Sequence, residues 1–195
     1  MTSSTARKKI IVGISGASGI IYGVRLLRIL RDLDIESHLV MSKSAQVTLT
    51  HELDMSVADV KALADVNYTN TDIGAAISSG SFKTAGMIVA PCSIKSLSEI
   101  TTGVTSSLLT RAADVVLKER KKLVLMVRET PLHLGHLRSM TAVTEAGAII
   151  YPPVPAFYAR PESLDAMVDH TLGRVLDLFD IDAGTVKRWN PANEA

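Results

Sequence analysis

The sequence contains a single cysteine, Cys92, among its 195 residues. One cysteine excludes an internal disulfide and is typical of proteins that work in a reducing compartment. No apolar run is long enough to cross a membrane, and none precedes Ile10 that could serve as a signal peptide. We therefore expect a cytoplasmic protein.

An excess of charge of either sign is also missing, because 21 Lys and Arg residues nearly balance 20 Asp and Glu residues. The resulting net charge of +1 gives no reason to expect nucleic-acid binding or a polybasic membrane contact. Aromatic residues make up 4% of the chain, whereas hydrophobic residues make up 47%. Such an aliphatic composition is typical of a parallel sheet that is buried on both faces.

Short apolar runs alternate with amphipathic segments along the chain. We expect strands at 10–12, 36–41, 85–90, 123–127 and 148–150, and helices at 20–30, 45–51, 54–65, 104–120, 135–146 and 162–179. The polar segment 66–83 is predicted to be a loop with room for one short strand, and residues 1–7 a flexible tail. This order predicts an α/β fold over 1–195: a single-domain, Rossmann-like (flavodoxin-like), doubly wound parallel sheet with helices on both faces.

The segment Gly13-Ile14-Ser15-Gly16-Ala17-Ser18-Gly19 lies between the first strand and the first helix. A strand, a turn of small residues and a helix together direct free backbone N–H groups toward an anion, so we expect a phosphate there. The glycine spacing does not match the dinucleotide fingerprint, and no acid follows the second strand to bind a ribose. A mononucleotide is therefore favoured over NAD; a tight turn without a ligand is the alternative.

In a doubly wound sheet, ligands bind beyond the carboxyl ends of the strands. The residues that follow the apolar strands are small, hydroxylated or charged: Ser15–Gly19, Ser42, Pro91–Ser96, Arg128-Glu129 and the turn 151–160. Ser42 is also expected to cap the next helix. The loop Cys92–Ser96 is consistent either with a phosphate or ring-edge contact or with a plain helix entry. Arg111, Asp114 and Lys118 share one helical face, for which solvated ion pairs are the simpler account.

Taken together, these segments resemble the flavin prenyltransferases, the UbiX/Pad-type family formerly described as aromatic acid decarboxylases. The resemblance covers about residues 8–189. It is carried by Gly13–Gly23, Ser42-Lys43-Ser44-Ala45-Gln46, Pro91-Cys92-Ser93-Ile94-Lys95-Ser96-Leu97, Arg111-Ala112-Ala113-Asp114-Val115, Lys118-Glu119-Arg120, Val127-Arg128-Glu129-Thr130-Pro131-Leu132 and Pro155-Ala156-Phe157-Tyr158.

The resemblance implies a transferase that joins a dimethylallyl group from dimethylallyl phosphate to reduced FMN without a metal. The product, prenylated FMN, serves a UbiD-type decarboxylase. The FMN-binding residues implied are Gly16, Ala17, Ser18, Ser42, Ser93, Ile94, Lys95, Ser96 and Arg128. The implied substrate-binding residues are Arg111, Lys118, Tyr158 and Arg174, and the implied catalytic residues are Glu129, Ser18, Glu52 and Lys118. A homo-oligomer, commonly a dodecamer, and a final helix that completes the site are also implied.

These residue types suit the implied reaction. Breaking an allylic C–O bond leaves a phosphate, which fixed cations stabilise, and a carboxylic acid at a strand end can move a proton. Two alternatives stay open. FMN-dependent peptidyl-cysteine decarboxylases have Pro-Ala-Ser-Ala-Asn-Thr where this chain has Pro91-Cys92-Ser93-Ile94-Lys95-Ser96, which lacks the asparagine. The other alternative is a non-enzymatic flavin-binding subunit of a decarboxylase complex.

Overall fold

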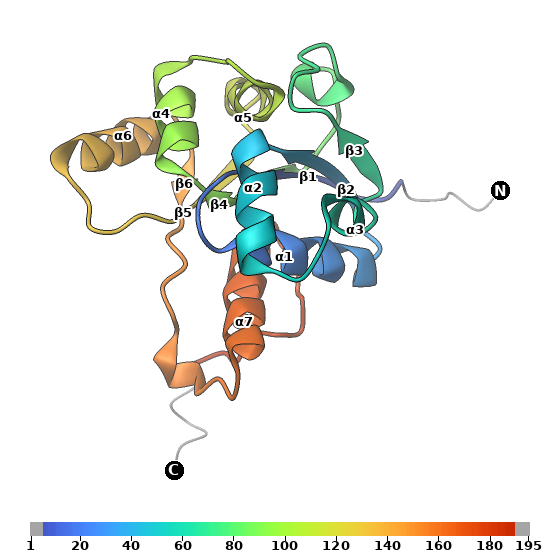
Figure 1. The fold of residues 1–195 in the computed structure, drawn as a ribbon, viewed down its shortest axis with the longest axis vertical. Helices are drawn as coiled ribbons and strands as arrows, with labels where there is room; N and C mark the ends of the chain where they lie inside the picture. Colours follow the sequence, from blue (N-terminus) through green and yellow to red (C-terminus); the bar gives the residue numbers. More distant parts are fainter. Residues whose placement is uncertain (1–5, 190–195) are drawn as a thin grey trace. The chain divides into compact units, whose positions relative to one another are not determined.

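A six-stranded sheet forms the centre of the fold, and the computed structural model describes residues 6–189. The strands are β1 (Lys9–Ile14), β2 (Glu36–Met41), β3 (Val66–Tyr68), β4 (Gly86–Cys92), β5 (Lys122–Val127) and β6 (Ile149–Ile150). All neighbouring pairs are parallel, in the order β3-β2-β1-β4-β5-β6 (Figure 1). This is the Rossmann strand order, so the predicted doubly wound sheet is confirmed. The strands β1 to β3 are added toward one edge of the sheet and β4 to β6 toward the other, so the strand order reverses between β1 and β4, where such sheets bind ligands.

Seven α-helices are found among the described residues. They are α1 (Ile20–Asp32), α2 (Lys43–Glu52), α3 (Val57–Lys61), α4 (Ile94–Thr102), α5 (Leu108–Lys118), α6 (Leu134–Glu145) and α7 (Leu164–Asp177), with two short 3₁₀ turns, η1 (Ala76–Ser78) and η2 (Phe157–Ala159). The helix expected over 54–65 is only the short α3, and segment 66–83 contains both the short strand β3 and η1.

The expectation of one helix over 104–120 was wrong at its start. The helix in this range is α5, which begins at Leu108, and a separate helix that was not expected, α4, precedes it over Ile94–Thr102. Gly103 ends α4 in a left-handed conformation with φ of 72°, and Ser107 then caps α5. The capping residue of α4 is Ser93. Ser96 lies in the first turn of α4 and donates its backbone N–H to the Ser93 hydroxyl.

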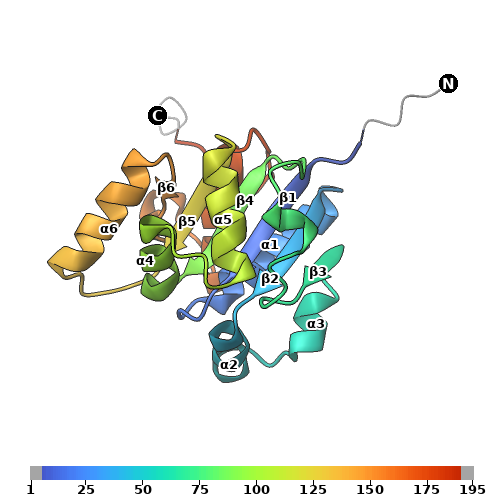
Figure 2. The same ribbon diagram turned by 90° about the horizontal axis from the view of Figure 1, so that it is seen from above.

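Helices cover both faces of the sheet (Figure 2). On one face, Ile11 of β1 and Met87 of β4 belong to a core cluster with residues of α4 and α5, such as Leu97 and Leu109. The buried residues of α1 are not part of this cluster, and α1 contacts β1, β2 and β4. Since side chains alternate along a strand, the intervening apolar residues of β1 point to the opposite face of the sheet, which α1 covers. This explains the continuous apolar runs of the sequence.

The chain divides into two compact units, the larger ending at Pro152 and the smaller beginning at Pro153. The sheet and helices α1–α6 belong to the larger unit. The smaller unit contains η2 and α7, which Ser163 caps through its hydroxyl. That the final helix completes the site stays a prediction. Within residues 6–189, no helix has the length and apolarity required to span a membrane.

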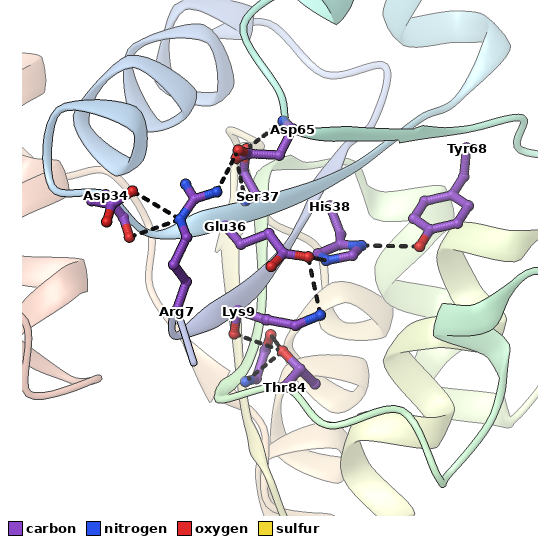
Figure 3. Close-up of polar contacts among 10 residues, drawn as sticks. Arg7, Lys9, Asp34, Glu36, Ser37, His38, Asp65, Tyr68 and Thr84 are labelled. Carbon is purple, nitrogen blue, oxygen red and sulfur yellow. Dashed lines mark hydrogen bonds and ion pairs between the residues drawn. The ribbon is translucent and has the colours of Figure 1, made fainter. Parts of the chain in front are cut away.

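A polar network fastens the three-residue edge strand β3 to β2 (Figure 3). The buried imidazole of His38 lies 2.9 Å from the Tyr68 hydroxyl through Nδ1 and 2.9 Å from the Glu36 carboxylate through Nε2. Lys9 pairs with the same carboxylate at 3.1 Å. At the start of β3, the Asp65 carboxylate accepts the backbone N–H of Ser37. These contacts hold an edge strand whose backbone hydrogen bonds alone are few.

The free energy of unfolding is expected to fall as the pH drops below about 6.5. Burial lowers the pKa of His38 from its ordinary value of 6.5, although Glu36 opposes the shift. As the pH falls below about 6.5, His38 is protonated in the unfolded chain but stays neutral in the folded chain. Proton uptake by the unfolded chain therefore favours unfolding in acid. Urea titrations at about pH 7.5 and about pH 5.5 measure this loss. We expect His38→Gln to show a smaller loss than the wild type, and His51→Gln, at an exposed histidine, to behave like the wild type. Equal losses in His38→Gln and the wild type would contradict the prediction.

Candidate active site

A pocket of about 640 Å³ lies where the chain leaves the carboxyl ends of β1, β2 and β4. It is lined by Gly16, Ser42, Lys43, Ser44, Val47, Asn70, Ser93, Lys95, Ser96, Glu99, Ser107 and Leu109. Most of these residues carry hydroxyl, amide or charged groups, and all belong to the larger unit. The pocket therefore coincides with the reversal point of the sheet, as the sequence predicted.

A second pocket, of about 620 Å³, lies at the opposite edge, beside the start of β1 and the segment that precedes β4. Its cations are already compensated in part. Arg7 pairs with Asp34 and Asp65, and Lys9 pairs with Glu36. It also lacks the helix starts that surround the first pocket. We therefore place the functional site at the carboxyl ends of the strands.

The ends of β1 and β4 are joined by the buried Ser15. Its hydroxyl donates to the carbonyl oxygen of Pro91 at 2.9 Å and accepts the backbone N–H of Ser93 at 2.7 Å. Ser15 was predicted among the ligand-edge residues. Because both hydrogen bonds stay within the protein, its role is to hold the two loops at a fixed separation.

The helices α2 and α4 both begin at the pocket. The hydroxyl of Ser42 accepts the N–H of Ala45 at 3.0 Å, and that of Ser93 accepts the N–H of Ser96 at 3.3 Å. Ser42 is thus confirmed as the cap of α2. The first two amides of a helix have no acceptor within the helix, so α2 and α4 can each direct two N–H groups and a positive dipole end at a ligand.

Gly16 allows a close approach to the backbone at the pocket wall. A Cβ atom at this position would collide with the side chain of Ser44 and come within 2.9 Å of its carbonyl carbon. Any residue other than glycine would therefore displace the start of α2. The close approach of Ser44 therefore explains why the predicted turn has a glycine at position 16.

The start of α1 already holds an anion, the carboxylate of Glu52. Its Oε2 atom accepts the backbone N–H groups of Gly19 and Ile20, both at 2.9 Å. This corrects the expectation of a phosphate at this helix end, since the chain's own carboxylate occupies it. A phosphate near the turn therefore has to rely on α2 and α4.

Two other predicted site residues act on the Glu52 carboxylate, Ser18 by a hydrogen bond and Arg128 by its charge. Burial acts to raise the pKa of its carboxyl. Hydrogen bonds from the Ser18 hydroxyl and the two amides, with the charge of Arg128, outweigh burial and bring the pKa below its ordinary value. The structure thus brings Ser18, Glu52 and Arg128 together, around an ionised carboxylate.

Glu129 follows Arg128 directly after β5. The backbone N–H of Arg128 donates to the carbonyl oxygen of Cys92 at 3.1 Å, which sets this segment beside the end of β4. The Glu129 side chain is exposed, and its carboxylate accepts the N–H of Thr130 at 3.0 Å. Within residues 6–189 it forms no ion pair with Arg128, so its carboxylate is available to a ligand.

Arg111 and Lys118 lie on the outer face of α5, as predicted. Arg111 pairs with Asp114 at 2.8 Å, and Lys118 pairs with Glu119 at 2.5 Å. α5 begins at the pocket, and Lys118 stands about 15 Å further along it, given a rise of 1.5 Å per residue. The structure does not bring Lys118 to the pocket of its own chain.

The two remaining predicted residues belong to the smaller unit. Tyr158 lies in η2, with its ring edge-to-face with those of His170 at 5.9 Å and Trp189 at 5.8 Å. Arg174, on α7, pairs with Asp177, which also binds Arg188. Both side chains are partly exposed. Their predicted contacts with the substrate stay predictions.

Comparison with known proteins identifies the family. A model of the flavoprotein family matches residues 1–189. The flavin prenyltransferase UbiX of Escherichia coli (strain K12) is 65% identical over 175 residues, which cover 89% of this chain and 93% of the relative. The chain belongs to the flavin prenyltransferase UbiX family. The predicted family and class of enzyme, a transferase, are confirmed.

Solved structures agree with this family. AnUbiX (PadA1), in complex with FMN and dimethylallyl pyrophosphate, superimposes with a TM-score of 0.93 at 50% identity, over 94% of this chain and 98% of that one. A dodecameric FMN-dependent UbiX-like decarboxylase from Escherichia coli O157:H7 gives a TM-score of 0.91 at 50% identity, over 93% and 99% of the two chains. The fold of this flavin prenyltransferase is thus that of its family.

Sequence reasoning missed several residues that line the pocket. They are Lys43, Ser44, Val47, Asn70, Glu99, Ser107 and Leu109. Ser107 could have been found as a cap, because Thr110 follows at capping-box spacing and the structure contains that box. Asn70 and Glu99 have no comparable signal. Asn70 comes from the loop after β3, and only the tertiary fold brings it to the pocket.

Cys92 is not available as a nucleophile. Its side chain is completely buried, and burial raises the pKa of the thiol to about 12. The thiol therefore stays neutral at physiological pH. Among residues 6–189, no group of three or more His, Cys, Asp or Glu side chains could hold a metal ion.

Proposed function

We propose that this flavin prenyltransferase joins a dimethylallyl group from dimethylallyl phosphate to reduced FMN. The product, prenylated FMN, then serves a UbiD-type decarboxylase. The observation that carries the proposal is the pocket at the sheet's reversal point, with two helix starts and the Ser18–Glu52–Arg128 cluster nearby. The relative that was solved with FMN and dimethylallyl pyrophosphate supports it.

The residues of the pocket fit FMN. Ser42 and Ser93 start α2 and α4, whose first amides, including those of Ile94 and Lys95, suit phosphate or ring oxygens. Gly16 and Ser96 line the wall. Ala17, Ser18 and Arg128 complete the proposed set from the neighbouring turn and the end of β5. When bound, reduced FMN supplies the electron-rich ring that accepts the prenyl group.

The proposed roles of the other residues follow from the charge that develops when the allylic C–O bond breaks. Arg111, Lys118 and Arg174, with the Tyr158 hydroxyl, stabilise the departing phosphate. Glu129 protonates the phosphate or removes a proton during ring closure on the flavin. Ser18 and Glu52 form a hydrogen-bonded pair at the same edge and assist this proton movement.

We also propose that copies of the chain assemble and share the site, as a dodecamer. Arg111 and Lys118 lie on an outward face of α5, so a second copy is needed to bring Lys118 near Glu129. Exposed apolar side chains on the same unit, including Val104, Leu134 and Leu137, supply surface for such contacts. The dodecameric relative supports this assembly. The free, buried Cys92 is consistent with the proposed cytoplasmic location.

The proposed function can be tested directly by mass spectrometry. The protein is incubated without oxygen with reduced FMN and dimethylallyl phosphate, and the flavin fraction is analysed. We expect a flavin that is heavier by one five-carbon prenyl unit, with none formed when oxidised FMN is supplied. Unchanged flavin in the complete reaction would contradict the proposal. Carbon dioxide released from a hydroxybenzoate or cinnamate by the pure protein would favour the FMN-dependent decarboxylase instead.

A further inference from the structure

Asn70 connects the edge of the sheet to the pocket. It lies two residues after β3, which the His38–Tyr68 hydrogen bond fastens to β2. Its backbone carbonyl oxygen accepts the N–H of Leu108 at 2.8 Å, and its side-chain Oδ1 accepts the N–H of Leu109 at 3.1 Å. Asn70 therefore caps the start of α5 with two acceptors while it lines the pocket.

These contacts fix the orientation of the Asn70 amide. Because Oδ1 faces a donor, the NH₂ group of Nδ2 is directed elsewhere. Nδ2 makes no hydrogen bond to any of residues 6–189, and Asn70 is only partly buried. The side chain thus has two unused hydrogen-bond donors on Nδ2, while its oxygen, Oδ1, is already engaged by the N–H of Leu109.

The start of α5 cannot offer its own N–H groups to a ligand. Asn70 accepts those of Leu108 and Leu109, and Ser107 accepts those of Thr110 and Arg111. The dipole of α5 nevertheless keeps this end positive. Asn70 replaces the occupied backbone donors with the two donors of Nδ2, in front of a positive helix end.

Charge within the pocket favours an anion at this position. The one carboxylate among the lining residues, Glu99, is held by the Ser106 hydroxyl at 2.9 Å and by Lys95 at 3.7 Å. A phosphate is repelled from Glu99 and is attracted to a wall of donors. Lys43 and Ser44, at the start of α2, provide such a wall together with Asn70.

We propose that Asn70 binds the phosphate group of FMN by donating hydrogen bonds from Nδ2. The inference rests on the proposed function and adds a binding residue to it. Asn70 is then a residue by which the pocket distinguishes FMN from riboflavin, which has the same ring system and ribityl chain without the phosphate.

The test is the substitution Asn70→Asp, with FMN and riboflavin as probes. Aspartate retains an oxygen for the N–H of Leu109, so α5 stays capped, but it lacks the donors and adds a negative charge. We expect FMN to bind about tenfold to a hundredfold more weakly, while riboflavin binds as it does to the wild type. Calorimetric titration measures both affinities, and circular dichroism checks that the protein is folded.

Two further variants separate a hydrogen bond from general charge. Thr69→Asp adds the same charge one residue away, at an exposed side chain that does not line this pocket, and is expected to change FMN affinity less than threefold. Asn70→Ala adds no charge, and it is expected to weaken FMN binding selectively as well as lowering the melting temperature through loss of the α5 cap.

The outcomes are distinguishable. FMN affinity within twofold of wild type in both folded Asn70 variants overturns the inference and leaves the proposed function intact. Equal weakening of FMN and riboflavin also overturns it, since Asn70 then acts on the rest of the flavin. Failure of the wild-type protein to bind FMN overturns the proposed function itself.

Discussion

Replacing Glu129 with glutamine is expected to slow prenyl transfer by about 10²–10⁴-fold, the usual contribution of a positioned acid or base. FMN affinity should stay near the wild-type value, because glutamine retains the size of the side chain and an oxygen for the N–H of Thr130. Since Glu129 is exposed and forms no ion pair within residues 6–189, the substitution has little to disturb in the fold. Single-turnover rates with saturating dimethylallyl phosphate measure the effect.

Glu145→Gln provides the matched control, because Glu145 is an exposed glutamate at the end of α6. It should keep the full rate. Full turnover by an intact Glu129→Gln oligomer would show that Glu129 is scaffolding. The search would then move to Ser18 and Glu52. Glu52→Gln is a less selective test, since it also removes a charge from the cap of α1 and is expected to reduce stability.

The elements that the sequence predicted best are those with strong local signals. The buried strands are continuous apolar runs, and strand 36–41 has the predicted bounds. The helix α4 was missed because Leu97 and Ile100 are its only large buried residues and its cap, Ser93, directly follows a strand. Pro91, near the end of β4, made the start of a helix hard to recognise, and the sequence Ser96-Leu97-Ser98-Glu99 has the spacing of a capping box three residues after the true cap.

The candidate site was predictable where a residue follows a strand, and unpredictable where the fold brings in a distant loop. Ser42, Ser93 and Arg128 follow strands, so the parallel sheet alone placed them at one edge. Asn70 reaches the pocket only because β3 lies at the sheet edge and its loop passes the start of α5. The capture of the α1 amides by Glu52 depends on how α2 packs, which spacing does not encode.

Two inactive variants are expected to recover activity when their subunits are mixed. Lys118→Ala removes a cation for the prenyl phosphate, and Glu129→Gln removes the proposed acid or base. If each site takes Glu129 from one copy and Lys118 from another, random assembly of equal amounts leaves about one site in four with both wild-type residues. Co-expression with two different tags, purification over both, and product formation per subunit measure the recovery.

The reason for expecting recovery is the length of α5. Its first turn borders the pocket, but Lys118 stands at its far end, where it pairs with Glu119 beside Gly80. If the substrate lies at the pocket, Lys118 of the same copy is too far along α5 to reach it, which is the basis of the proposed shared site. Each variant tagged twice and mixed only with itself should stay inactive, which controls for effects of tagging. Doubly tagged mixtures that are no more active than their parents would show that the site is not shared through Lys118, and would remove Lys118 from the proposed machinery.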